Sequence, residues 1–148
     1  MRKAILFVTI VINLILTSSC SSSKAVISHE VDLAKYEYVV FGNETSGDKA
    51  LDDIIMLVEN EITNTRLQVV SASQGLQLIN QGKFVLSPNI NVKTQYWDGG
   101  HTYITISFYD YNTNQRIAVL KSSGIGLSIS QDQNIALNAI KKKLQKVF

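Results

Sequence analysis

The chain has 148 residues, 45% of them hydrophobic, and a formal net charge of +2. Its length suits a single domain with an ordinary hydrophobic core. A charge this close to neutral gives no reason to expect nucleic-acid binding, which depends on a marked excess of basic side chains. The single cysteine excludes a disulfide bond within one chain.

Residues 1–19 have the pattern of a secretion signal. Arg2 and Lys3 supply a positive start, and residues 4–16 are almost entirely apolar. This apolar run is shorter than the roughly 20 residues that a helix needs to cross a bilayer, and small residues follow it at a cleavage position. A buried core helix is the alternative, but no polar face interrupts the run. We predict a signal peptide over residues 1–19, whose removal leaves 129 residues.

Cys20 follows this segment directly, in the stretch Leu-Thr-Ser-Ser-Cys. The stretch resembles the lipobox of bacterial lipoproteins, although Thr17 stands where that family usually has leucine. The resemblance implies that the sulfur of Cys20 takes a diacylglyceryl group, that palmitate completes the anchor, and that Cys20 becomes the first residue. The chemistry needs a thiol because a thiolate is a far better nucleophile than a serine hydroxyl. A secreted protein with a free thiol is the alternative.

The residues after Cys20 bear on the location of the protein in the cell. In many Gram-negative cells an aspartate in the next position holds lipoproteins at the inner membrane, whereas this chain has Ser21. The resemblance therefore implies the outer membrane. Because Lys24 follows the serines with no acidic run, we expect the periplasmic face.

The first predicted elements lie between residues 20 and 80. Residues 20–30 begin with serines and lack a helical period, which predicts a tether, so the folded domain is expected over residues 31–148. Residues 36–41 are rich in aromatic and β-branched side chains and predict a strand. A helix capped at Thr45 follows, with apolar residues at helical spacing. A short strand over residues 67–70 and a short helix over 73–80 come next.

Three strands and a helix are predicted in the second half. Residues 84–96 alternate between apolar even positions and polar odd positions, and Pro88 within them indicates a bend or a sheet edge. Strands over residues 102–111 and 117–121 follow, each after a turn. A capping box beginning at Ser130 opens the last helix.

The predicted order is β-α-β-α-β-β-β-α. A helix between the first two strands predicts that they are parallel, while the last three strands should form an antiparallel meander. The expected fold class is α/β in the broad sense and α+β in the narrower classification. A mixed sheet should form one layer, and helices largely on one of its faces should form the second.

The charged side chains divide unevenly along the chain. Residues 20–80 carry 4 basic and 9 acidic side chains, while residues 81–148 carry 8 basic and 3 acidic ones. Many of the basic ones lie in the last helix, between Lys141 and Lys146. They suit anionic lipid headgroups or a solvated helix end, where the helix dipole favours cations, and we favour the second interpretation. The acidic first helix is expected as a neighbour in the chain or as the surface of a homodimer partner.

Two stretches resemble a family of small envelope lipoproteins of unknown function. Residues 32–41 (DLAKYEYVVF) are similar to the start of its mature domain, and residues 108–117 (FYDYNTNQRI) are similar to its penultimate strand and turn. The second stretch also resembles the amino-terminal domain of the translocation protein TolB. Val119 and Leu120 stand where the lipoprotein family has a tryptophan. The resemblance implies a fold and an envelope location, with no catalytic residue.

The sequence offers few residues for chemistry. His29 and His101 are the only histidines, and no metal-ligand spacing, phosphate-binding glycine loop or nucleophile motif appears. We therefore predict neither a metal nor a cofactor. Gly124 and Gly126 precede the last helix, and a bent strand end is favoured there over a phosphate site.

One turn has reactive potential, namely residues 96–103. Asp98 in this turn is placed to orient His101 as a general base, and Trp97 is suited to stack on a sugar ring. The alternative is a hairpin tip whose aromatic side chains pack across strands, and we favour it. The expected function is that of a non-enzymatic lipoprotein anchored through Cys20, whose sheet edge or charged helices bind another envelope protein. A sugar or cell-wall binder, or a hydrolase, centred on the turn from Trp97 to His101 is the alternative.

Overall fold

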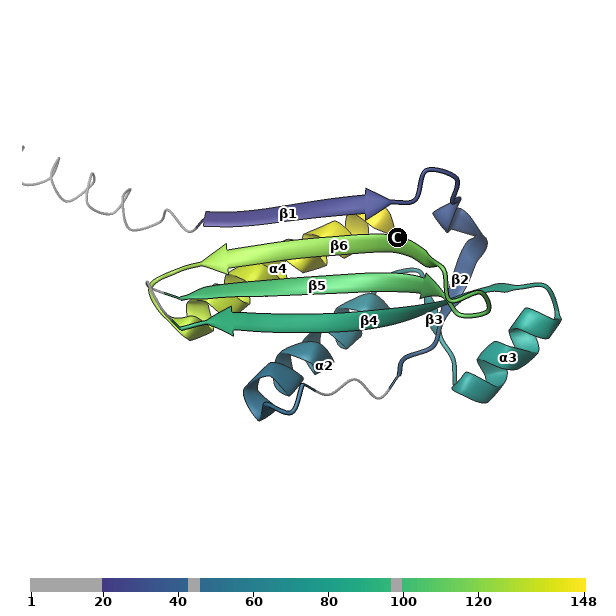
Figure 1. The fold of residues 1–148 in the computed structure, drawn as a ribbon, viewed down its shortest axis with the longest axis horizontal. Helices are drawn as coiled ribbons and strands as arrows, with labels where there is room; N and C mark the ends of the chain where they lie inside the picture. Colours follow the sequence, from purple (N-terminus) through teal and green to yellow (C-terminus); the bar gives the residue numbers. More distant parts are fainter. Residues whose placement is uncertain (1–19, 43–45, 97–99) are drawn as a thin grey trace, which may run out of the picture.

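The computed structural model describes residues 20–42, 46–96 and 100–148 (Figure 1). The predicted signal peptide, the predicted helix cap Thr45, and Trp97 and Asp98 lie outside these residues. The elements are, in chain order, β1 (Cys20–Ile27), the 3-10 helix η1 (Leu33–Lys35), β2 (Tyr36–Val39), α2 (Lys49–Thr63), β3 (Gln68–Val69), α3 (Ala72–Asn80), β4 (Phe84–Gln95), β5 (His101–Asp110), β6 (Arg116–Ile125) and α4 (Ile129–Val147).

The six strands of the described residues all belong to one mixed sheet. Their order across the sheet is β1-β6-β5-β4-β2-β3. Strands β4, β5 and β6 form an antiparallel meander, and β1 adds to it antiparallel to β6. Strand β2 runs parallel to both β3 and β4. The predicted parallel pair and the predicted meander are both confirmed.

Helices α2 and α4 cover one face of the sheet, and α3 lies beyond its end (Figure 1). The core lies between this face and the two helices. Helix α4 buries Ala136, Ile140 and Leu144, which recur at helical spacing, while α2 buries Ile54, Ile55, Val58 and Ile62. The sheet contributes the even positions of β4 and β5, such as Ile90 and Ile104. The predicted α+β class, with helices largely on one face, is confirmed.

The first strand corrects the sequence prediction. Residues 20–27 do not form a tether but pair along their whole length with β6, from Cys20 opposite Ile125 to Ile27 opposite Ala118. An edge strand of this kind is held by backbone hydrogen bonds, and its side chains are mostly exposed. It therefore needs no alternation of apolar residues, which was the signal on which strand prediction relied.

Two helices begin at residues other than those predicted. Helix α2 is capped by Asp48, whose side chain accepts a hydrogen bond from the N–H of Ala50. Helix α4 is capped by Ser128 instead of Ser130, with the N–H of Gln131 donating to its hydroxyl. Serine and aspartate are good caps wherever they fall, so several nearby candidates made the starting residue ambiguous.

Pro88 lies where β4 becomes an edge. Strand β2 pairs with β4 only as far as Leu86, so the side of β4 that faced β2 has no strand partner from Pro88 onwards among the described residues. A proline has no N–H to donate, and this position does not require one on that side. The predicted edge near Pro88 is confirmed.

Candidate functional site: the Cys20 end and the open face of the sheet

Five elements meet at the end of the sheet where β1 begins. In the strand register Cys20 is opposite Ile125, the last residue of β6, and Thr102 at the start of β5 is opposite Gly124. Helix α4 starts four residues after β6 ends. The left side of Figure 1 shows β1, β5, β4 and β6 meeting there with the start of α4. We call this region the Cys20 end.

Apolar side chains are exposed at the Cys20 end. Leu127, in the loop between β6 and α4, is 85% exposed, and its neighbours Ile125 and Ile129 are 37% and 40% exposed. Tyr96, directly after β4, is 60% exposed. Single exposed apolar residues are common on soluble proteins, but a group of them marks an interaction site. This group was not predicted, because residues 125–129 resemble any apolar stretch between two elements and Tyr96 comes from a separate segment.

The predicted Trp97, Asp98 and His101 cluster lies partly outside the described residues. Trp97 and Asp98 are among those not described. His101 is half-buried at the start of β5, and its ring stacks on that of Tyr103 with centroids 5.0 Å apart. The two residues are two apart on one strand and therefore share a face of the sheet. The stack lies within one strand, so the expected packing of aromatic side chains across strands stays a prediction.

Asp132 is a buried carboxylate at the start of α4. It is fully buried in the first turn of the helix, and its Oδ1 accepts a hydrogen bond from the N–H of Gly126. Its Oδ2 has no hydrogen-bond partner among the residues that the structure describes. A negative charge here interacts favourably with the helix dipole. The chain's own carboxylate thus takes the place that an anion would need beside Gly126, and the preference for a bent strand end over a phosphate site stays a prediction.

Two glycines allow the close packing around Asp132. A side chain at Gly124 would meet the backbone of α4, where its Cβ would lie 2.6 Å from the nitrogen of Ala136. Gly100 has φ +85°, and a Cβ there would strike Oδ2 of Asp132. Only glycine adopts such a φ without strain. These residues position α4 and the start of β5, and so fix the shape of the Cys20 end.

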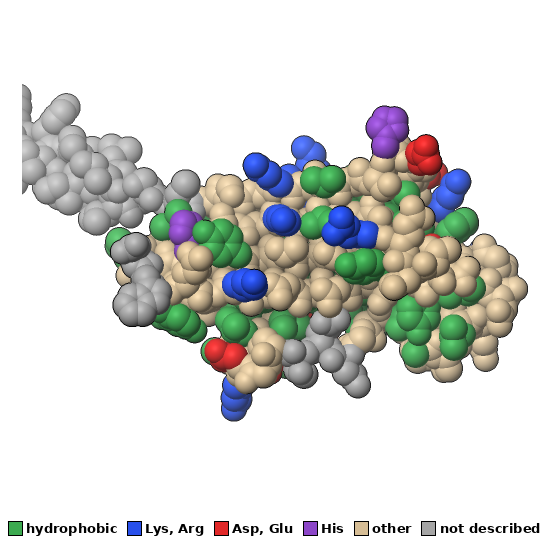
Figure 2. Space-filling view, in the orientation of Figure 1, with side chains coloured by type: hydrophobic (Ala, Val, Ile, Leu, Met, Phe, Trp, Pro, Cys, Tyr) green, Lys and Arg blue, Asp and Glu red, His purple; other side chains and the backbone are tan. Residues whose placement is uncertain are grey.

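The face of the sheet opposite the helices is open to solvent and polar. The side chains on this face come from the odd-numbered residues of β4 and β5 and from the residues of β6 and β1 that lie beside them in the strand register. Most of these residues are Ser, Thr, Asn, Tyr or Lys. Its basic members are Lys24, Lys93, Lys121 and Arg116, all exposed. None of the described residues on this face is acidic. Figure 2 shows Lys and Arg side chains spread over these strands, with the acidic side chains at the margins.

Lys24 and Lys121 are directly opposite each other on β1 and β6. Residues paired in this way have Cβ atoms about 5 Å apart, and like charges at this separation are destabilising. Neither lysine forms an ion pair with any part of the chain that the structure describes. This pair was not predicted, because residues 20–30 were expected to form a tether, whereas the pairing of β1 with β6 brings the two lysines together.

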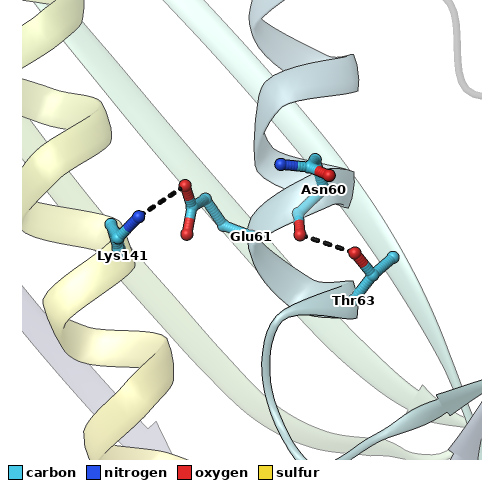
Figure 3. Close-up of polar contacts among 4 residues, drawn as sticks. All are labelled: Asn60, Glu61, Thr63 and Lys141. Carbon is cyan, nitrogen blue, oxygen red and sulfur yellow. Dashed lines mark hydrogen bonds and ion pairs between the residues drawn. The ribbon is translucent and has the colours of Figure 1, made fainter.

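The acidic and basic helices contact each other within the chain. Lys141 of α4 and Glu61 of α2 form an ion pair with Nζ and Oε1 2.9 Å apart (Figure 3). On α2, the hydroxyl of Thr63 donates to the carbonyl of Asn60, near the end of the helix. For these two helices the structure shows the first of the predicted alternatives, in which the acidic helix is a neighbour in the chain.

Within residues 20–42, 46–96 and 100–148, no three His, Cys, Asp or Glu side chains are grouped so that they would hold a metal ion. No helix in these same ranges has the length and apolar character needed to cross a membrane.

Comparisons with known proteins show the fold alone. No protein-family model matches the sequence, and no curated protein sequence matches it. Among solved structures, the PelC dodecamer from Paraburkholderia phytofirmans is similar, with a TM-score of 0.50, 16% identity, and coverage of 86% of this chain and 97% of that one. A PDZ domain protein from Parabacteroides distasonis is similar with a TM-score of 0.54 and 11% identity. The match covers 93% of this chain and 38% of the chain of that protein. The chain therefore shares its α+β fold with proteins of very different sequence.

Proposed function

We propose that the protein is a non-enzymatic lipoprotein of the bacterial envelope, anchored to the outer membrane through Cys20 and facing the periplasm. In this proposal the anchor holds the Cys20 end against the bilayer, and the rest of the domain projects away from it as an interaction or assembly module. The lipobox-like stretch before Cys20 is the basis of the anchor.

The observation that carries the proposal is the strand register at Cys20. Because β1 begins at Cys20 opposite Ile125, an acyl chain on this residue would leave the domain with no spacer. The bilayer would then meet Ile125, Leu127 and Ile129, whose exposed apolar side chains are unfavourable in water and favourable at a lipid surface. Tyr96 would lie at the same level, and tyrosine is enriched at membrane interfaces.

The opposite edge of the sheet is the part of the domain that we assign to an envelope protein partner. Strand β3 has only two residues, and its Val69 is 49% exposed. Leu76 of α3 and Phe84 at the start of β4 are also exposed. An unpaired edge with apolar side chains nearby is suited to strand addition or to docking of a partner. A partner at this edge would approach the domain away from the membrane.

A second copy of the chain is also a candidate for this edge. The PelC protein with a similar fold is described as a dodecamer, and a homo-oligomer is therefore part of the proposal. Light scattering on the purified lipidated protein measures the mass of the assembly directly. A monomeric mass at all concentrations would leave a different envelope protein as the partner.

The anchor is tested by the intact mass of the protein from the membrane fraction. We expect the mass of residues 20–148 plus two or three acyl chains, and a soluble, unmodified product from a Cys20→Ser variant. A mature chain that stays soluble and carries no lipid would contradict the anchor. Crosslinking in intact cells, compared between the wild type and Cys20→Ser, then tests whether a partner depends on the anchor.

A further inference from the structure

The open face of the sheet carries a repulsive charge arrangement that the fold does not need. Lys24 and Lys121 are directly opposite each other, and Thr105 continues the same row on β5. Lys93 and Arg116 add two more positive charges to the face, and no acidic residue on it, among those described, offsets them. Replacing either of the paired lysines by a neutral side chain would remove a repulsion. The arrangement therefore costs stability and is suited to an anion that bridges the two ammonium groups.

From this arrangement we propose that the open face of the sheet binds an acidic polysaccharide. The carboxylate, phosphate or sulfate groups of such a polymer would lie between Lys24 and Lys121, and further along they would reach Lys93 or Arg116. This inference goes beyond the proposed function and does not rest on lipid at Cys20, because the face itself carries every residue that it uses.

The uncharged side chains of the face favour a glycan over a protein. Asn91, Thr105, Ser107 and Ser123 supply amide and hydroxyl groups in neighbouring rows of the sheet, and such groups are matched by sugar hydroxyls. Protein interfaces are depleted in lysine and serine and are built around buried aromatic anchors. Tyr103, which is 38% exposed and stacked on His101, offers a ring at one end of the face for a sugar to pack against.

The shape of the face also favours a long polymer over a membrane. The strands of the meander have 10 to 12 residues, so that the face extends over roughly 30 Å at about 3.3 Å per residue. A bilayer would require apolar side chains along this length. Among the described residues of the face, Val26 and Val119 are aliphatic and are opposite each other in a single row, Ile125 is aliphatic at the Cys20 end of β6, and Val85 is aliphatic but buried near the start of β4.

The test measures binding of the full-length chain, purified in detergent, to fluorescein-labelled polygalacturonate by anisotropy. We expect binding by the wild type that weakens as salt is added, because the charges are exposed and screened. The double variant Lys24→Gln and Lys121→Gln should bind about tenfold more weakly, as expected for the loss of two exposed charge contacts. Its thermal stability should be equal to or above that of the wild type, so that weaker binding is not a result of unfolding.

A second double variant supplies the matched control. Lys142→Gln and Lys146→Gln remove the same charge from exposed positions on α4, which packs on the other face of the sheet. Its affinity for polygalacturonate should stay near that of the wild type. An equal loss of affinity in both double variants would overturn the proposal, because it would show that only net charge matters. Unchanged binding after Lys24→Gln and Lys121→Gln would also overturn it.

Three further probes separate a polysaccharide from other ligands. Neutral dextran should not bind, and poly-glutamate and phosphatidylglycerol vesicles should bind more weakly than polygalacturonate. Dextran binding as tight as that of polygalacturonate would exclude a role for the charge. Tighter binding to poly-glutamate would indicate an acidic protein partner, and tighter binding to the vesicles, lost in the Lys24 and Lys121 variant, would indicate lipid headgroups. Each of these results would overturn the assignment to an acidic polysaccharide.

Discussion

The hydroxyl of Tyr36 donates a hydrogen bond to Oδ2 of Asp110 at 2.9 Å, which joins the first residue of β2 to the last residue of β5. Both side chains are buried. The other carboxylate oxygen of Asp110 accepts hydrogen bonds from the backbone N–H groups of Asn112 and Thr113 and thereby holds the turn before β6. One carboxylate thus fixes both the parallel part of the sheet and the meander, and so maintains the open face.

Tyr36→Phe should lower the free energy of unfolding by about 1–3 kcal/mol, because it leaves Oδ2 of Asp110 buried without its donor. Tyr38→Phe is the matched control. The hydroxyl of Tyr38 makes no hydrogen bond to any residue that the structure describes, so its loss should change stability by less than about 0.5 kcal/mol. Urea denaturation measures both. Equal effects of the two substitutions would show that the contact between Tyr36 and Asp110 is not stabilising.

The same contact predicts a loss of stability at high pH. Burial, together with the hydrogen bond to Asp110 and its charge, raises the pKa of Tyr36 from 10.0 to about 12. The folded state holds this proton more tightly than the unfolded state. The protonated hydroxyl of Tyr36 therefore contributes fully to the free energy of unfolding below pH 10, and this contribution is lost between pH 10 and pH 12. It amounts to roughly 2 kcal/mol. Wild type and Tyr36→Phe should therefore converge in stability over this interval, and parallel pH curves would contradict the assignment.

Gly124→Ala should destabilise the protein by about 3 kcal/mol, because the new methyl group would press on the backbone of α4 and force the helix away from β6. Gly82→Ala is the comparison. Gly82 has φ +78° but nothing within 4 Å of its Cβ position, so that only backbone strain of about 1 kcal/mol is expected. Thermal unfolding of both variants tests the difference. A smaller loss at Gly124 than at Gly82 would mean that α4 does not pack against β6 as described.

The ion pair between Glu61 and Lys141 should contribute little. Glu61 is 14% exposed and Lys141 is 42% exposed, and partly exposed pairs of this kind are worth roughly 0.2–1 kcal/mol. A double-mutant cycle with Glu61→Gln and Lys141→Gln should give a coupling energy in this range that falls as salt is added. A coupling that does not change with salt would indicate a hydrogen bond that does not depend on charge.

The sequence predicted those parts of the fold that have a buried side. Alternation in β4 and helical spacing in α2 and α4 indicated these elements because one face of each packs against the core. Strand β1 escaped prediction because an edge strand with solvent-exposed side chains has no such pattern. The same reason hid the pair of Lys24 and Lys121, which depends on how β1 pairs with β6.

The candidate site was predictable only in part. A cysteine after an apolar run is a local signal, and Cys20 could therefore be singled out from the sequence. The exposed group of Ile125, Leu127 and Ile129 could not, because the sequence around it resembles any apolar stretch between two elements. Asp132 also appeared as an ordinary residue of a helix start. Its burial and its contact with Gly126 depend on the tertiary packing of α4 against β6.

The depth of the Cys20 end in the membrane tests the proposed anchored orientation most directly. Cys20 is the only cysteine of the chain, so that after its lipidation a new cysteine can be labelled alone with an environment-sensitive fluorophore. Leu127→Cys places the label at the Cys20 end, and Leu76→Cys places it on α3, where the native side chain is also exposed. In vesicles with brominated lipids, we expect strong quenching at position 127 and little at position 76. Equal quenching at the two positions, or quenching at neither, would contradict a domain held by its Cys20 end against the bilayer.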